Sequence, residues 1–124
     1  GDARCYLASN GKLKQITTDH TALVEMKNEY PDTADVAEQL QTRHVVTRVI
    51  GYSFPEPPEY NAVDLHEGDR ILLCSDGLWS MLDEQLIYTT IIAAGSPEKA
   101  SEELVAMANE AGGNDNITAL LTFC

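Results

Sequence analysis

The sequence predicts an α+β fold in which an antiparallel sheet is layered with helices. Apolar, β-branched stretches and amphipathic stretches follow one another in the order strand, strand, helices, strand, strand, helix, helix, strand. Strands that follow one another directly favour hairpins, and helices that occur in separate blocks favour layers against an antiparallel sheet. The turn residues Asn10-Gly11 and the helix start Ser96-Pro97-Glu98 mark two of the boundaries most directly.

The first half of the chain predicts a hairpin followed by helices. Asn10-Gly11 suits the two positive φ angles of a type I′ turn, so the stretches on either side are expected to pair. Pro31 ends the helix before it, because proline disfavours the α conformation in the preceding residue. The elements expected here are strands over 4–9 and 12–16, helices over 22–28 and 34–41, and an apolar, β-branched stretch over 45–50.

The second half predicts two strands, two helices and a closing strand. Three prolines within residues 51–59 indicate a loop inside one domain rather than an interdomain linker. The Ile-Leu-Leu-Cys core of residues 70–75 indicates a strand that is buried on both faces. Asp83 and Ser96 are expected to cap the two helices. The expected elements are strands over 60–65, 70–75 and 117–123, and helices over 84–93 and from 97 to Gly112-Gly113.

Composition excludes several classes of function. The chain has 124 residues, of which 44% are hydrophobic, so it can bury the core of one modest domain. Eight basic residues against 20 acidic ones give a net charge of −12, which disfavours binding to nucleic acid or to an anionic membrane surface. No apolar run approaches the length of a membrane span, and three cysteines without a CxxC spacing predict a reducing, cytoplasmic setting.

Two turns beside the most apolar stretches carry the candidate functional residues. Asp76 follows the apolar residues 71–74, and Asp115 follows Gly112-Gly113 just before another apolar stretch. If these two strands pair antiparallel, the end of one and the start of the other meet at one edge of the sheet. Two carboxylates that converge there repel each other unless a hard cation lies between them. The sequence therefore predicts a metal site with Asp76 and Asp115 as ligands.

Each candidate also has a purely structural interpretation. Ser75-Asp76-Gly77 and Asn114-Asp115-Asn116 consist of residues that are common in turns and need do nothing more than reverse the chain. The other candidates compete with exposed or solvated positions, and the histidines fit no recognised zinc spacing. These remaining candidates are Asp2, the pair Asp19-His20, His44 and His66.

Five short motifs are spread over the whole chain. They are Gly1-Asp2-Ala3-Arg4, Thr18-Asp19-His20, Val46-Thr47-Arg48-Val49-Ile50-Gly51, Leu73-Cys74-Ser75-Asp76-Gly77-Leu78-Trp79 and Asp115-Asn116-Ile117-Thr118. In this order and spacing they resemble the C-terminal part of the metal-dependent (type 2C, PPM) serine/threonine protein phosphatases. The resemblance implies part of an α-β-β-α sandwich, with antiparallel sheets flanked by helices. It also implies that residues 1–124 are the C-terminal portion of a single phosphatase domain whose N-terminal half is absent.

The resemblance implies a hydrolase of phosphoserine and phosphothreonine in proteins. Asp76 and Asp115 would ligate one of two Mn²⁺ or Mg²⁺ ions, and Asp2 would join Asp76 around a third. The ions would share a water or hydroxide that attacks the phosphorus in line. The expected partner is a phosphorylated protein substrate in cytoplasmic signal transduction, with no nucleic acid and no membrane.

The chain also departs from the family pattern. The Asp-Gly-x-Gly-Gly stretch, the acidic ligand before it and the phosphate-holding arginine are not among residues 1–124, and Ala3 and Ser80 replace a usual serine and aspartate. We therefore expect the isolated chain to have little or no activity, and to self-associate through strands that the absent half would cover. Two alternatives stay open: a non-catalytic, phosphatase-like interaction or regulatory module, and a sporulation- or stress-type phosphatase that acts on an anti-sigma antagonist protein.

Overall fold

The computed structural model describes residues 1–33, 45–51, 53 and 57–124. It divides into two compact units: unit 1 comprises Gly1–Asp2 and Thr18–Tyr60, and unit 2 comprises Ala3–Thr17 and Asn61–Cys124. The helix expected over 34–41 lies outside the described residues. Within the described part of the chain, no helix has the length and apolar character needed to cross a membrane.

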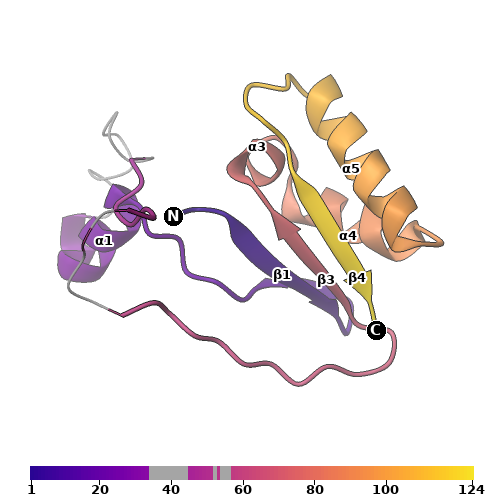
Figure 1. The fold of residues 1–124 in the computed structure, drawn as a ribbon, viewed down its shortest axis with the longest axis horizontal. Helices are drawn as coiled ribbons and strands as arrows, with labels where there is room; N and C mark the ends of the chain where they lie inside the picture. The colour runs from indigo at the N-terminus through magenta and orange to yellow at the C-terminus, as the bar shows by residue number, and fades with distance from the viewer. Residues whose placement is uncertain (34–44, 52, 54–56) are drawn as a thin grey trace. The chain divides into compact units, whose positions relative to one another are not determined.

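Unit 2 is built on a four-stranded sheet with helices on one face (Figure 1). Every pair of neighbouring strands is antiparallel, and the spatial order is β2-β1-β3-β4. This confirms the α+β fold with an antiparallel sheet. The strands are β1 (Arg4–Ser9), β2 (Lys12–Gln15), β3 (Arg70–Cys74) and β4 (Ala119–Phe123).

The hairpin between β1 and β2 forms as the sequence predicts. Asn10 and Gly11 both have positive φ angles, 50° and 78°, and Ser9 pairs with Lys12. The strand expected over 60–65 is wrong, because these residues are exposed and pair with no strand in the described part of the chain. An alternating, β-prone stretch becomes a strand only where a partner supplies the ladder of hydrogen bonds.

Three helices of unit 2 follow β3, and two of them begin where the sequence predicts. The carboxylate of Asp83 accepts a bond from the N–H of Leu86 (2.8 Å), and the hydroxyl of Ser96 accepts one from Lys99 (3.3 Å). These caps satisfy backbone donors that have no partner inside the helix. The helices are α3 (Asp76–Trp79), α4 (Glu84–Ala93) and α5 (Pro97–Glu110). The short helix α3 was not among the expected elements, because Ser75-Asp76-Gly77 is typical of a turn.

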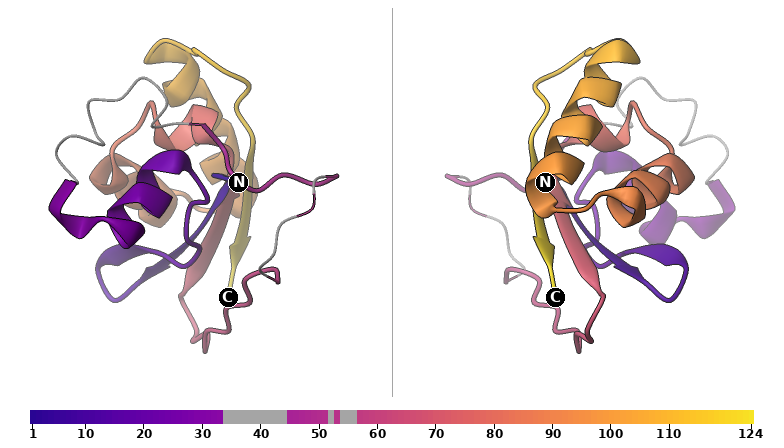
Figure 2. Two further views of the ribbon diagram at one scale, coloured as in Figure 1. Left: turned by 90° about the vertical axis from the view of Figure 1, so that its left-hand side faces the viewer. Right: turned by 90° about the vertical axis from the view of Figure 1, so that its right-hand side faces the viewer.

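The core lies between one face of the sheet and these helices, as the side views of Figure 2 show. Side chains at alternate strand positions point into it, so the prediction that residues 70–75 are buried on both faces is wrong. Leu73 points to the other face and is 47% exposed. The core side chains are those of Tyr6, Ala8, Leu72, Cys74, Leu78, Leu82, Ile87, Ile91, Leu104 and Ala108.

Unit 1 contains the helix α1 (Ala22–Glu29) and the 3₁₀ helix η1 (Pro31–Thr33). Thr21 caps α1 through its hydroxyl and forms an isolated antiparallel bridge with Val46. The predicted helix over 22–28 is confirmed, and it ends just before the proline that was expected to stop it.

Candidate metal centre

The pairing of β3 with β4 brings the two candidate aspartates to one edge of the sheet. Cys74, the last residue of β3, pairs with Ala119, the first residue of β4. One step further, the N–H of Ser75 donates to the carbonyl oxygen of Thr118 at 3.1 Å. The turn that carries Asp76 therefore starts beside the turn that carries Asp115, as the antiparallel hypothesis requires.

The backbones of the two turns are in contact at Gly77. A Cβ atom on this residue would lie 2.5 Å from the carbonyl oxygen of Asn116 and 3.4 Å from the carbonyl carbon of Asp115. Real Cβ atoms do not approach backbone so closely, so only glycine allows this approach. The glycine thus sets how near the Asp115 turn lies to the first turn of α3.

Each aspartate is oriented by the amide that follows it. An Asp76 carboxylate oxygen accepts a bond from the N–H of Gly77 (2.9 Å), and an Asp115 carboxylate oxygen accepts one from the N–H of Asn116 (2.6 Å). A carboxylate has about four lone-pair positions. Each local bond orients its carboxylate, and among the described residues it leaves most of these positions for another group.

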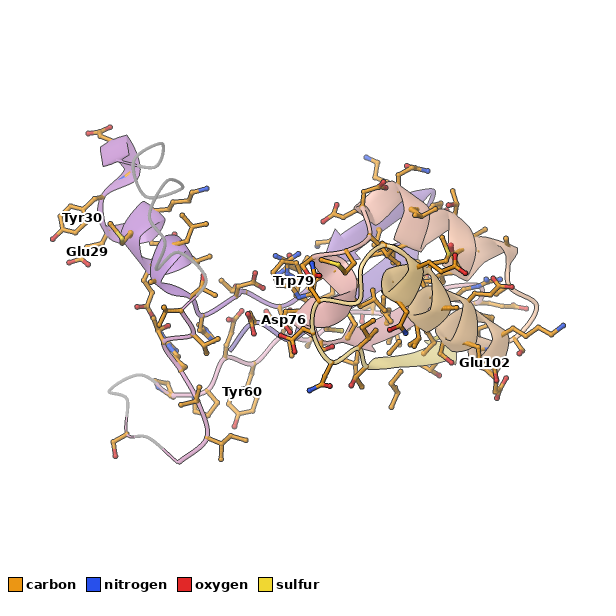
Figure 3. All side chains as sticks on the ribbon, turned by 90° about the horizontal axis from the view of Figure 1, so that it is seen from above. Glu29, Tyr30, Tyr60, Asp76, Trp79 and Glu102 are labelled. Carbon is orange, nitrogen blue, oxygen red and sulfur yellow. The ribbon has the colours of Figure 1, made fainter. Side chains whose placement is uncertain are left out.

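An arginine packs against an aromatic ring at this end of unit 2. The guanidinium of Arg4 lies 3.5 Å from the centre of the Trp79 ring and donates to the hydroxyl of Tyr6 at 2.7 Å. In Figure 3, Asp76 and Trp79 lie at the same end of unit 2, whereas Glu102 of α5 lies away from them. The contact ties β1 to the helix that begins with Asp76.

The cysteine beside the site, Cys74, is a buried thiol. Cys74 is buried in the core, and burial raises the pKa of its thiol to about 12. It therefore stays protonated at neutral pH, and the thiolate is the form that attacks or binds metal. Cys74 therefore acts as a small buried hydrophobe in the core.

Comparison with known proteins agrees with the resemblance noted in the sequence. Residues 1–117 match the family model of protein phosphatase 2C. The chain belongs to this family.

Curated and solved relatives are named as protein phosphatases or serine/threonine phosphatases. The chain is 34% identical to the protein phosphatase PhpP of Streptococcus pneumoniae, over 98% of this chain and 49% of that protein. It matches the structure of the S. agalactiae serine/threonine phosphatase with a TM-score of 0.88 and 30% identity, covering 100% of this chain and 52% of that one. The chain spans about half the length of these relatives.

One solved relative carries metal. The structure of the catalytic domain of the serine/threonine protein phosphatase PstP is a complex with two manganese ions, and it matches with a TM-score of 0.65 and 30% identity over 98% of this chain and 49% of that one. The protein phosphatase 2C family is metal-dependent. Carboxylate oxygens on two touching turns are the donors that such hard cations prefer. The described residues contain no group of three or more potential ligands placed to hold a metal, and Asp76 and Asp115 as ligands stay a prediction.

The remaining candidates lie elsewhere. Asp2 belongs to unit 1, so its part in a joint site with Asp76 stays a prediction. Asp19 is buried, which contradicts the solvated-loop interpretation, and its neighbour His20 lies 3.6 Å from a Glu59 carboxylate oxygen. His66 is exposed and lies 3.6 Å from Asp69, and His44 lies outside the described residues.

Sequence reasoning missed three contacts around the two aspartate turns. It gave no role to the hydroxyl of Ser75, to the packing of Gly77 or to the stacking of Arg4. The residues were visible in two of the quoted motifs, but a motif does not show which atoms meet across the sheet.

Proposed function

We propose that the protein containing this chain removes phosphate from phosphoserine and phosphothreonine in other proteins, and that it depends on Mn²⁺ or Mg²⁺. One observation carries the proposal: the Asp76 and Asp115 turns touch at the paired ends of β3 and β4. In a family of metal-dependent phosphatases, two carboxylates at one sheet edge are most simply explained as ligands.

The residues of this chain would hold and orient the ion. Asp76 and Asp115 supply carboxylate oxygens whose direction is already fixed by the N–H groups of Gly77 and Asn116. Asp2 is proposed to join Asp76 around a further ion. A bound ion of this kind lowers the pKa of its water and offsets the charge of the phosphate. The partner is a phosphorylated protein.

A chimera tests the activity. The first half of the S. agalactiae phosphatase is joined to this chain, which covers 52% of that structure and is proposed to correspond to its C-terminal portion. We expect manganese-dependent hydrolysis of a phosphothreonine peptide that is lost in Asp76→Asn and in Asp115→Asn. The matched control is Asp64→Asn, which changes an exposed aspartate outside the two turns. The chain alone, assayed in parallel, is expected to show little or no turnover.

The chimera also separates the enzyme from the alternative, a non-catalytic interaction module. A folded chimera that binds manganese and the phosphopeptide but does not turn it over supports the module. Turnover that is unchanged in Asp76→Asn would contradict the proposed ligands. Turnover by the unfused chain would show that it assembles a working site by itself.

A cytoplasmic location belongs to the same proposal. It rests on the three cysteines, which are all free, since unpaired thiols are typical of reducing compartments. Fractionation of cells that produce the protein, followed by antibody detection, tests it. Recovery with the periplasmic or secreted fraction would contradict it.

We also propose that the isolated chain self-associates through the face of the sheet that carries no helices. Leu73 and Leu120 are neighbours in the β3–β4 ladder, 47% and 57% exposed, and they line a shallow hollow of about 330 Å³ with Cys5. Exposed apolar sheet surface of this kind promotes association. Light scattering should show species larger than a monomer, and fewer of them in Leu120→Lys. A stable monomer at all concentrations would contradict this.

A further inference from the structure

Ser75 makes three hydrogen bonds to the turn that carries Asp115. Its hydroxyl lies 3.0 Å from the carbonyl oxygen of Asn116, to which it donates, and 3.0 Å from the N–H of Thr118, from which it accepts. Its own N–H donates to the carbonyl oxygen of Thr118 at 3.1 Å. One residue therefore holds both ends of a short backbone segment in the neighbouring turn.

The hydroxyl is used in an unusual way for its position. Ser75 is the N-cap of α3, where a serine side chain ordinarily accepts a bond from the N–H two or three residues later. Here the side chain makes no capping bond. The N–H of Gly77 is instead satisfied by the carboxylate of Asp76. The hydroxyl of Ser75 bonds across to the other turn.

The bonds lead in two steps from Ser75 to Asp115. The hydroxyl fixes the carbonyl of Asn116 and thereby the orientation of that residue. The N–H of Asn116 in turn donates to the Asp115 carboxylate at 2.6 Å. Gly77 packs against the same carbonyl from the α3 side. The Ser75 hydroxyl is thus connected to the Asp115 carboxylate through a single residue, Asn116, without touching the carboxylate itself.

We propose that Ser75 is a positioning residue that fixes the Asp115 carboxylate relative to Asp76 and so sets the affinity of the pair for a divalent cation. The proposal rests on the metal site of the proposed function, and it adds a residue that determines the cation affinity of that site. The role requires one atom that donates and accepts at the same time. Serine and threonine hydroxyls do both, whereas alanine does neither.

The experiment compares three variants of the chain by NMR. Ser75→Ala removes the hydroxyl, and Ser75→Thr restores it at a position that is only partly buried. Ser101→Ala is the matched control, because its hydroxyl bonds to the Glu98 carbonyl (2.8 Å) inside α5. Two quantities are measured: hydrogen exchange of the Thr118 amide without metal, and the Mn²⁺ concentration that half-broadens the amide signals around residues 76 and 115.

We expect Ser75→Ala to raise the half-broadening concentration about tenfold, the lower end of the range for groups that orient metal ligands. Exchange of the Thr118 amide should become about tenfold faster, because this N–H loses its acceptor. Ser75→Thr should lie within about twofold of the parent in both quantities. Ser101→Ala should match the parent at both sites.

The outcomes separate this inference from the function on which it rests. A parent chain whose signals around residues 76 and 115 do not respond to manganese would overturn the proposed metal site, and the positioning role with it. A parent that responds while Ser75→Ala responds equally would overturn only the positioning role, even if Thr118 exchanges faster. Failure of Ser75→Thr to restore the affinity would also overturn it, since the hydroxyl would not be the determinant.

Discussion

The two ends of strand β3 carry the same kinds of residue in different roles. At the start, Asp69 is buried, and its carboxylate accepts bonds from the hydroxyl of Ser9 and the N–H of His66. At the other end, Asp76 accepts a bond from its own neighbour, Gly77, and lies beside a second acidic turn. An aspartate bonded by two other segments is structural. Within the part of the chain that the structure describes, the Asp76 carboxylate is bonded by a local amide, and a carboxylate held in this way retains acceptor positions for a ligand.

The arginines at the two ends differ in the same way. Arg70 lies 4.1 Å from the centre of the Phe123 ring and also donates to the carbonyls of Ile91 and Ala94 at the end of α4. Arg4 stacks on Trp79 and donates to one tyrosine hydroxyl. Arg70 therefore ties a helix to the sheet, whereas Arg4 supports the turn that carries Asp76. Both residues are arginines that lie against an aromatic ring, and their hydrogen-bond partners determine their different roles.

Gly77→Ala should have the largest effect, at the Asp76 end. The added Cβ would lie 2.5 Å from a backbone oxygen, so one turn must move away from the other. We expect a loss of about 3 kcal/mol in the free energy of unfolding, the upper end for overpacking. Urea denaturation measures this. In the same variant, the signals around residue 115 should respond to manganese only at higher concentration.

Gly95→Ala is the matched control for this comparison. Nothing lies within 4 Å of the position that its Cβ would take, and its φ is not in the left-handed region. Its stability should be unchanged or raised by about 0.4–1 kcal/mol, because alanine restricts the unfolded chain. Equal losses in the two variants would show that contact between the turns has no special cost.

Arg70→Ala should have the next largest effect, and it should separate stability from metal binding. Loss of its charged bonds to the end of α4 is expected to cost about 1.5–3 kcal/mol. Arg4→Ala removes the contact with the Trp79 ring and the bond to the Tyr6 hydroxyl, and we expect a loss of about 0.5–2 kcal/mol. Only Arg4→Ala should weaken the manganese response. A weaker manganese response in Arg70→Ala would contradict the idea that the two ends of β3 have separate roles.

Most of the fold could be predicted from local signals. Asn10-Gly11, Asp83 and Ser96 each determine a turn or a helix start through their own side chains or φ angles, and each prediction is confirmed. The strand over 60–65 and the burial of β3 on both faces were wrong for one reason. Strand pairing and burial both depend on which segments pack beside the residues in the fold, and an apolar sequence pattern does not identify those segments.

The candidate site was predicted in outline but not in detail. The Asp76 and Asp115 turns lie side by side because β3 and β4 pair antiparallel, and an antiparallel sheet was predicted from the sequence. The hydroxyl of Ser75 could not be assigned, because a serine before a helix is ordinarily a cap. Here the Ser75 side chain makes no capping bond, and the carboxylate of Asp76 accepts the bond from the N–H of Gly77 instead. Asp2 stays a prediction, since it belongs to the other unit.

The smallest expected effect is a pH dependence of stability at Asp69, at the start of β3. The Ser9 hydroxyl, followed by the backbone N–H of His66, holds the pKa of Asp69 below its ordinary value. A lowered pKa in the folded state gives a contribution that is complete above the unfolded pKa, about 3.9, and is lost as the pH falls through the folded value. The stability difference between the parent and Asp69→Asn should therefore be constant near neutrality and shrink below about pH 4. Asp64→Asn, which removes the charge of an exposed aspartate, is measured by urea denaturation at each pH as the control. A difference for Asp69→Asn that does not change with pH would mean that the charge of this carboxylate is not what stabilises the start of β3.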